Sequence, residues 1–254
     1  MDVEVPGFQG GDRTSLDLPE EEGKLLQAVE TSGKPLVVVL MNGSALAVNW
    51  AAQNANAILD AWYSGEEGGG AIAETLAGAN NPAGRLPVTF YKGVDQLPDF
   101  TNYAMTERTY RYFHGSPLYP FGYGLSYSKF TYSNLQLSTE RLHAGDPLAA
   151  QVDIKNVSGP DGDEVVEVYL TPPQIPGAPI RALRGLKRIH LRAGETSHVQ
   201  ITLSPRDLSL VNLSGDRMVT PGEYQLSLGG GQPTATSAVV SGKFTIEGER
   251  KLPE

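Results

Sequence analysis

The chain has 254 residues, with 29 acidic and 20 basic side chains, a formal net charge of −9, four histidines and no cysteine. The acidic balance argues against a phosphate-binding surface for DNA or RNA. The absence of cysteine excludes disulfides and thiolate metal sites, and the scattered histidines suggest no ligand cluster. No apolar run reaches the roughly 18 residues of a membrane span.

The length allows one large domain or two smaller ones. Residues 1–128 carry 15 acids and 7 bases, a net charge of −8, whereas residues 129–254 carry 14 and 13, a net charge of −1. A strongly acidic first half and a nearly neutral second half favour two domains of different origin. We therefore expect domains at 1–128 and 129–254.

In the first half, continuous apolar runs alternate with short helical patterns after a loop-like start at residues 1–19. Such alternation is typical of an α/β fold with a mostly parallel sheet and flanking helices. An unbroken run such as residues 36–41 predicts a strand buried on both faces. The predicted helices are 20–31, 46–54 and 66–76, and the predicted strands are 36–41, 57–63 and 86–91.

From about Lys129 the pattern changes to short alternating segments separated by turn clusters such as Ser158–Gly162 and Thr220–Gly222. This spacing is typical of an antiparallel β-sandwich. The strands expected from it are 149–154, 164–170, 198–203, 224–228 and 243–246. The basic stretch between Arg181 and Arg192 indicates a solvated strand face rather than a nucleic-acid surface.

Three consecutive glycines, Gly68 to Gly70, follow Glu66 and Glu67. A glycine-rich loop at a helix start can cradle phosphate, but adjacent carboxylates would repel it and no GxxxxGK[ST] pattern is present. The other interpretation is structural. The glycines let the helix pack close to the sheet, the acids favour its N-terminus, and Ser64 caps it.

Seven aromatic residues gather between residues 110 and 127. They could stack on sugar rings, or they could pack a linker that docks the sandwich on the α/β domain. Trp50 and Trp62 lie in or beside apolar runs and are expected in the core. The seven are Tyr110, Tyr112, Phe113, Tyr119, Phe121, Tyr123 and Tyr127.

Two sequence blocks carry a family resemblance: AILDAWYSGEEGGGAIAETLAGANNPAGRLPVTF at 57–90 and PLYPFGYGLSYSKF at 117–130. Together they resemble the C-terminal part of glycoside hydrolase family 3, which holds β-glucosidases and β-xylosidases. The wording NVSGPDGDEVVEVYLTPP at 156–173 and TPGEYQLSLG at 220–229 is similar to the fibronectin type III-like domain that often ends these enzymes. The resemblance implies an immunoglobulin-like or fibronectin type III-like sandwich after a partial α/β domain.

Retaining glycoside hydrolysis needs two carboxyl groups about 5–5.5 Å apart. In family 3 the nucleophile is an Asp on a preceding (β/α)-barrel, a fold of about 250 residues. The resemblance therefore implies that the barrel is missing here. The segment GFQGGDRTSLDLP at 7–19 follows the family's acid/base Glu by a few residues, which leaves Glu4 or a position upstream of Met1. Asp12 and Arg13 form either a structural ion pair or a sugar contact.

The resemblance implies a C-terminal portion of a β-glucosidase or β-xylosidase, inactive alone, with no cofactor and with its β-linked substrate bound through the barrel. The alternative is a non-catalytic carbohydrate-binding, structural or interaction module. A sheet lacking its first strands would expose an edge near 36–41 or 57–63 and favour self-association. The start MDVEVPGFQGG has no signal-peptide pattern, although most relatives are exported.

Overall fold

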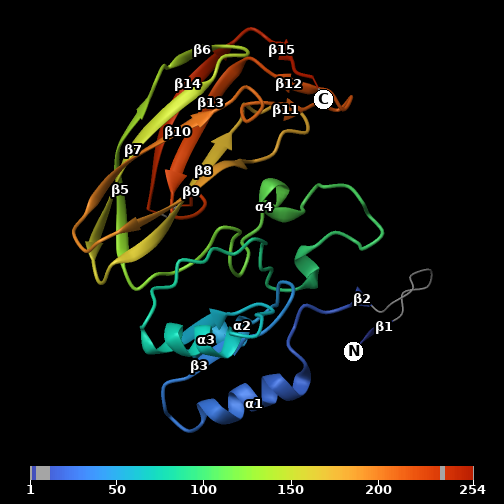
Figure 1. The fold of residues 1–254 in the computed structure, drawn as a ribbon. Helices are drawn as coiled ribbons and strands as arrows, with labels where there is room; N and C mark the ends of the chain where they lie inside the picture. The colour runs from blue at the N-terminus through green and yellow to red at the C-terminus, as the bar shows by residue number, and fades with distance from the viewer. Residues whose placement is uncertain (1, 4–11, 235–237, 254) are drawn as a thin grey trace. The chain divides into compact units, whose positions relative to one another are not determined.

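The computed structural model describes residues 2–3, 12–234 and 238–253 (Figure 1). The chain forms two compact units that interleave along the sequence. The first unit holds residues 1–79, 88–109 and 113–120, and the second holds 80–87, 110–112 and 121–254. Among the described residues, no helix combines the length and apolar character needed to cross a membrane.

The first unit alternates short strands and helices, as the sequence predicts. Three acidic residues at the start of α1 lie favourably against the helix dipole. Gly78 ends α3 in the left-handed conformation, with φ 74°. The elements are β1 (Asp2–Val3), β2 (Asp12–Arg13), α1 (Glu20–Glu30), β3 (Val37–Leu40), α2 (Asn49–Asn54), β4 (Ala57–Asp60), α3 (Gly68–Ala77) and the 3₁₀ turn η1 (Val94–Gln96).

β3 and β4 pair in parallel, from Val37 opposite Ala57 to Leu40 opposite Asp60. This pairing confirms the parallel arrangement expected for the α/β region. The prediction that this strand is buried on both faces was wrong, because β3 buries only alternate residues. Val38 and Leu40 are buried, whereas Val37 is 46% exposed. Within the described residues, no third strand joins this sheet.

The strand expected at 86–91 is wrong. Only Phe90 makes a bridge, to Tyr119. Pro87 has no N–H to offer a ladder, and the N–H of Leu86 instead donates to the carbonyl of Tyr123. The segment bends at Pro87 and Val88 and does not join a sheet.

Ser64 does not cap α3, which corrects a second expectation. Glu67 occupies the N-cap position, and no side chain there makes a capping hydrogen bond. Ser64 instead lies against Gly68, where a Cβ atom would collide with the serine side chain. Gly68 is therefore needed for close packing, whereas a Cβ at Gly69 would meet nothing within 4 Å.

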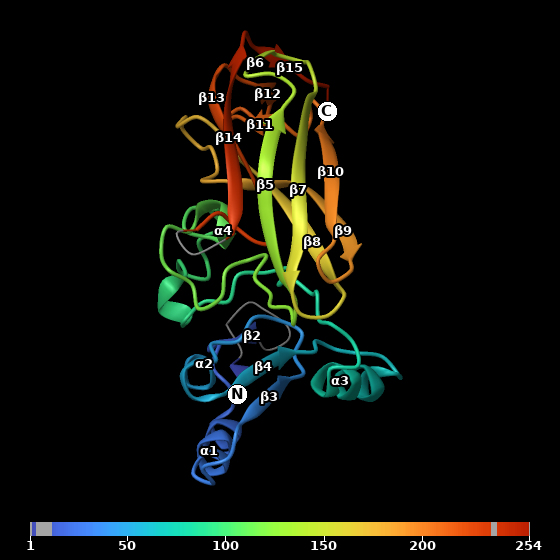
Figure 2. The same cartoon turned by 90° about the vertical axis from the view of Figure 1, so that its left-hand side faces the viewer.

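The second unit contains the predicted β-sandwich. In Figure 2 its three-stranded sheet, β10-β7-β5, faces the viewer. This sheet packs against the five-stranded sheet β6-β14-β13-β8-β9. The strands listed from the sequence omit β5 and the short strands β6, β11, β12 and β15, whereas β9 coincides with the basic stretch expected to form a solvated strand face. The elements are α4 (Thr109–Tyr112), β5 (Lys129–Leu137), β6 (Arg141–His143), β7 (Leu148–Ser158), β8 (Gly162–Thr171), β9 (Ala182–Leu191), β10 (Thr196–Leu203), β11 (Leu210–Val211), β12 (Arg217–Val219), β13 (Gly222–Gly229), β14 (Val239–Glu247) and β15 (Arg250–Lys251).

The core lies between these two sheets and comes from alternate strand positions. On β7, Ala150, Val152 and Ile154 are buried, whereas Gln151, which lies between Ala150 and Val152, is exposed. Strand β8 departs from this pattern, since residues on both of its faces are buried. Val166, Val168 and Leu170 face the core, with Glu167 and Tyr169 on the opposite face.

Candidate functional site

The predicted site residues lie in the least described part of the chain. Glu4 is outside the described residues. Asp12 and Arg13 form β2, paired with Val3 and Asp2 of β1, and the structure describes only their backbone. Their interpretation as an ion pair or a sugar contact stays a prediction.

The carboxyl ends of β3 and β4 bring two polar side chains to one edge of the parallel sheet, the location where α/β folds commonly bind ligands. Asn42 follows β3 and donates through Nδ2 to the carbonyl of Ser44 at 2.8 Å. Asp60 ends β4, and burial raises the pKa of its carboxyl above the usual value. Its Oδ1 accepts the N–H of Trp62 at 3.3 Å.

Trp62 has a positive φ of 53°, which is rare for a large side chain. Its ring meets Phe90 edge to face, with centroids 6.2 Å apart. The contact fixes the turn after β4, but Trp62 and Trp50 are both only half-buried, so the core position expected for the two tryptophans was wrong.

The aromatic residues between 110 and 127 mostly contact other rings of their own unit. In the second unit, Tyr110 stacks on Phe121 at 4.2 Å and meets Tyr169 edge-on at 6.1 Å. In the first unit, Phe113 packs on Tyr91 and Tyr119 on Phe90. Rings packed in this way within each unit argue against an open sugar platform, and the docking of the sandwich on the α/β domain stays a prediction.

A buried polar cluster, the Arg85 cluster, lies in the second unit. Arg85 Nη2 is 2.8 Å from Glu164 Oε2, with the two side chains only 9% and 4% exposed. Its Nε donates to the carbonyl of Gly230 at 2.8 Å. Tyr132 donates to the other Glu164 oxygen at 2.6 Å. Each polar group of Glu164 therefore has a protein partner.

Glu167 lies three positions further along β8. Burial raises its pKa to about 6, and Tyr169 donates to its Oε2 at 2.6 Å. Burial also raises the pKa of Glu164. Two neighbouring carboxyls with perturbed pKa values suggest a glycosidase pair. Both residues are only 3% exposed, which leaves no room for a sugar or an attacking water, so we assign them a structural role.

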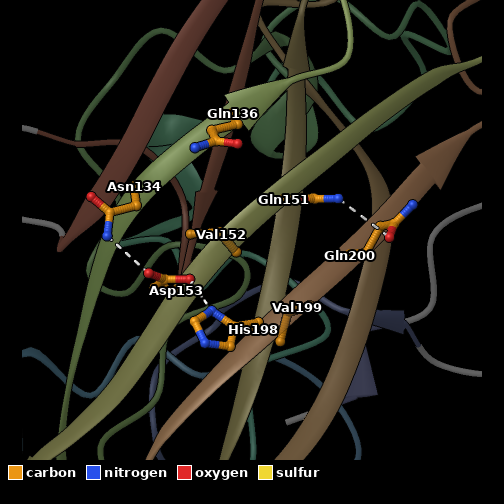
Figure 3. A pocket seen from close by; sticks show the side chains of 8 residues that line it. All are labelled: Asn134, Gln136, Gln151, Val152, Asp153, His198, Val199 and Gln200. Atoms are coloured by element: carbon orange, nitrogen blue, oxygen red, sulfur yellow. Dashed lines mark hydrogen bonds and ion pairs between the residues drawn. The ribbon is translucent and has the colours of Figure 1, made fainter.

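The outer face of the three-stranded sheet carries a hollow of about 390 Å³, which we call the outer-face hollow (Figure 3). It is open to solvent, and six of its side chains are polar. Val152 and Val199, both buried, lie beneath them. The lining residues are Asn134, Gln136, Gln151, Val152, Asp153, His198, Val199 and Gln200.

Three polar side chains of the outer-face hollow are held together by hydrogen bonds. Asp153 accepts from Asn134 Nδ2 at 2.8 Å and contacts His198 Nδ1 at 2.5 Å (Figure 3). The hydrogen bonds from Asn134 and His198 lower the pKa of the Asp153 carboxyl. The carboxylate is therefore ionised and fixed in position at neutral pH.

Sequence reasoning singled out neither the Arg85 cluster nor the outer-face hollow. Arg85 carries no local signal, because its partner Glu164 lies 79 residues away in the sequence. The hollow does have a signal: polar residues occupy alternate positions of β7 and β10. Without the register between strands, however, that alternation indicates only a solvated face.

Comparison with known proteins places the chain. Residues 4–127 match the model of the glycosyl hydrolase family 3 C-terminal domain, and residues 164–232 match that of the fibronectin type III-like domain. A xylan 1,4-beta-xylosidase of Xylanibacter ruminicola is 39% identical over 230 residues, covering 90% of this chain and 26% of that protein. A periplasmic beta-glucosidase of Salmonella typhimurium is 36% identical over 87% of this chain and 31% of its own length.

The crystal structure of a beta-glucosidase from Kluyveromyces marxianus superposes with a TM-score of 0.83 at 32% identity, over 96% of this chain and 30% of that one. The chain thus spans between a quarter and a third of these relatives. The resemblance found in the sequence is confirmed, and the chain belongs to glycoside hydrolase family 3, with the family's C-terminal domain followed by a fibronectin type III-like domain.

Proposed function

We propose that this chain is the C-terminal portion of a retaining β-glycosidase that hydrolyses O-glycosyl bonds of β-glucosides or β-xylosides. The alignment with the Xylanibacter ruminicola xylosidase carries the proposal, since it runs through 90% of this chain at 39% identity. The chain covers only 26% of that protein, so the rest of the catalytic machinery would come from sequence outside these residues. One relative is named a xylosidase and another a glucosidase, so the comparisons are compatible with a xyloside or a glucoside as substrate.

By itself, this 254-residue chain should be inactive. Hydrolysis with retention needs a nucleophile and an acid/base at close range, and removing one such group costs orders of magnitude in rate. Among the described residues, the buried carboxyls are Glu164 and Glu167 of β8, and protein side chains already hydrogen-bond to both. Glu4 stays a candidate acid/base, and Asp12 and Arg13 stay candidate sugar contacts.

The experiment compares three proteins on aryl β-glucoside and aryl β-xyloside: this chain, its Glu4→Gln variant, and a chimera. In the chimera, this chain replaces the aligned 26% of the Xylanibacter ruminicola protein. We expect no turnover by the chain or the variant, and turnover by the chimera. Turnover by the chain that Glu4→Gln abolishes would overturn the proposed inactivity. A folded but inactive chimera would contradict the proposed role as a glycosidase portion.

A second candidate function is a non-catalytic carbohydrate-binding module. The outer-face hollow favours it, because amide side chains line a concave surface of the sandwich. The two functions are compatible, since binding at the hollow requires no catalytic group.

A further inference from the structure

We propose that the outer-face hollow of the fibronectin type III-like sandwich is a saccharide-binding site, in which a row of three glutamines and an anchored carboxylate hold sugar hydroxyls. The inference rests on the second candidate function above and not on the first, because it needs no hydrolytic activity and holds whether or not the chain contributes to catalysis. It rests on how the sheet register arranges the polar side chains.

Three glutamines form one row across the sheet. Gln151 of β7 lies opposite Gln136 of β5 on one side and opposite Gln200 of β10 on the other. Neighbouring strands lie about 4.8 Å apart, so the row spans roughly 10 Å. Gln151 Nε2 lies 3.4 Å from Gln200 Oε1, a long hydrogen bond that leaves both amides free to turn toward a ligand.

A second row lies beside the first. Asp153 of β7 is opposite His198 of β10, and its carboxylate accepts a hydrogen bond from Asn134 of β5. Asn134 has a φ of 54° at the irregularity between Ser133 and Gln136. A β-bulge of this kind re-aims a side chain, and here Asn134 bonds to Asp153. The second row is therefore rigid, whereas the glutamine row is adjustable.

The donors and acceptors match neutral hydroxyl groups. A glutamine or asparagine amide both donates and accepts, as a hydroxyl does, and a carboxylate accepts from two hydroxyls. An anionic ligand would be repelled by Asp153. No lysine, arginine, phenylalanine, tyrosine or tryptophan lines the hollow, and the valines beneath it are buried, so a phosphate or an apolar ligand has little to contact.

A metal ion is also a poor match. Three or more His, Asp or Glu side chains placed to hold one occur nowhere among the described residues. A polyhydroxylated ligand is therefore the class that these side chains fit best. Because no tyrosine, tryptophan or phenylalanine ring supplies a large stacking surface, the affinity should be low, with a Kd of about 1 mM or weaker.

The test is a titration of the ¹⁵N-labelled full chain with xylotriose and, separately, cellotriose, followed by NMR. We expect saturable shifts confined to β5, β7 and β10 with at least one of the two sugars. Gln151→Ala and Gln200→Ala should each weaken binding about fivefold, the effect of one lost hydrogen bond. Both positions are exposed, so each spectrum should stay folded.

Thr202→Ala is the matched control, because Thr202 is exposed two positions beyond Gln200 on β10 and outside the hollow. It should bind as the unmodified chain does. An absence of saturable shifts with both sugars would overturn the proposal. Shifts on another surface, or equal binding by all three variants, would overturn it as well.

Discussion

Arg85 and Glu164 form a buried ion pair, with Nη2 2.8 Å from Oε2 and side-chain exposures of 9% and 4%. The pair joins the segment Asn80–Pro87 to strand β8, 79 residues further along the chain. Both belong to the second compact unit. The segment therefore folds with the β-sandwich, although its sequence matches the family's α/β C-terminal domain.

Arg85→Met should destabilise the second unit by about 3–5 kcal/mol, because it leaves the Glu164 carboxylate buried without its cation. The double variant Arg85→Met/Glu164→Gln should lose less than the two single changes together. Both tryptophans lie in the first unit, so tryptophan fluorescence in urea reports that unit, and a far-UV circular dichroism transition that fluorescence does not show reports the sandwich.

The control for these Arg85 and Glu164 variants is the exposed ion pair of Lys243 and Glu223, whose side chains are 64% and 65% exposed. Lys243→Met should change the unfolding free energy by less than about 1 kcal/mol. An Arg85→Met variant as stable as this control would show that the buried pair has no structural role.

Gly122→Ala should destabilise the second unit by two effects. Gly122 has a φ of 79°, which disfavours any side chain, and an added Cβ would collide with the Glu167 carboxylate. Gly215→Ala is the matched control, since Gly215 has a φ of 84° with nothing within 4 Å. We expect about 1 kcal/mol for Gly215→Ala and at least about 2 kcal/mol for Gly122→Ala in thermal or urea unfolding. Equal losses would refute the close-approach explanation.

The order of elements could be predicted from the sequence because it depends on local patterns. Continuous apolar runs gave β3 and β4, and alternation with turn clusters gave β7, β8, β10, β13 and β14. The strand expected at 86–91 was wrong because its backbone hydrogen bonds form at two separate points, Leu86 and Phe90, and not as a continuous ladder. The periodicity of apolar residues cannot distinguish a strand paired in a sheet from a segment that pairs at isolated points.

The candidate sites could not be predicted because they depend on pairing between distant strands. Gln136, Gln151 and Gln200 become neighbours only through the register of β5, β7 and β10. Glu167 was an unremarkable outward position of a strand until the fold buried it to 3% exposure. Long-range contacts of this kind leave no trace in spacing along one sequence.

Glu167 makes stability depend on pH. Its pKa is raised from 4.5 to about 6 in the folded protein, so the folded state holds the proton more tightly than the unfolded chain. The unfolding free energy should therefore fall by about 2 kcal/mol as pH rises from 4.5 to above 6, then level off. Glu164 contributes with the same sign, so Glu167→Gln should reduce this slope without removing it.

Urea unfolding of the second unit at pH 4.5 and 7.5 measures the difference. Asp153 and Asp163 have pKa values below the usual one for aspartate. Their contribution to the unfolding free energy is therefore lost only as the pH falls toward those lowered values, and it does not mask the effect of Glu167 at pH 4.5 and above. Glu167→Gln with the same pH dependence as the unmodified chain would contradict the assignment.

The 254-residue chain should self-associate through apolar surface of its first unit. Helix α1 buries none of its residues, Leu25 is 62% exposed, and Met41, just after β3, is 63% exposed. Open strand edges and uncovered apolar side chains favour association. We expect a concentration-dependent mass in sedimentation velocity, shifted toward the monomer by Leu25→Lys/Met41→Lys. Leu213→Lys is the control, because Leu213 is 84% exposed but lies in the second unit; it should leave the association unchanged. A monomer at every concentration would refute the prediction, and an equal effect of Leu213→Lys would show that added charge, rather than the first-unit surface, controls the association.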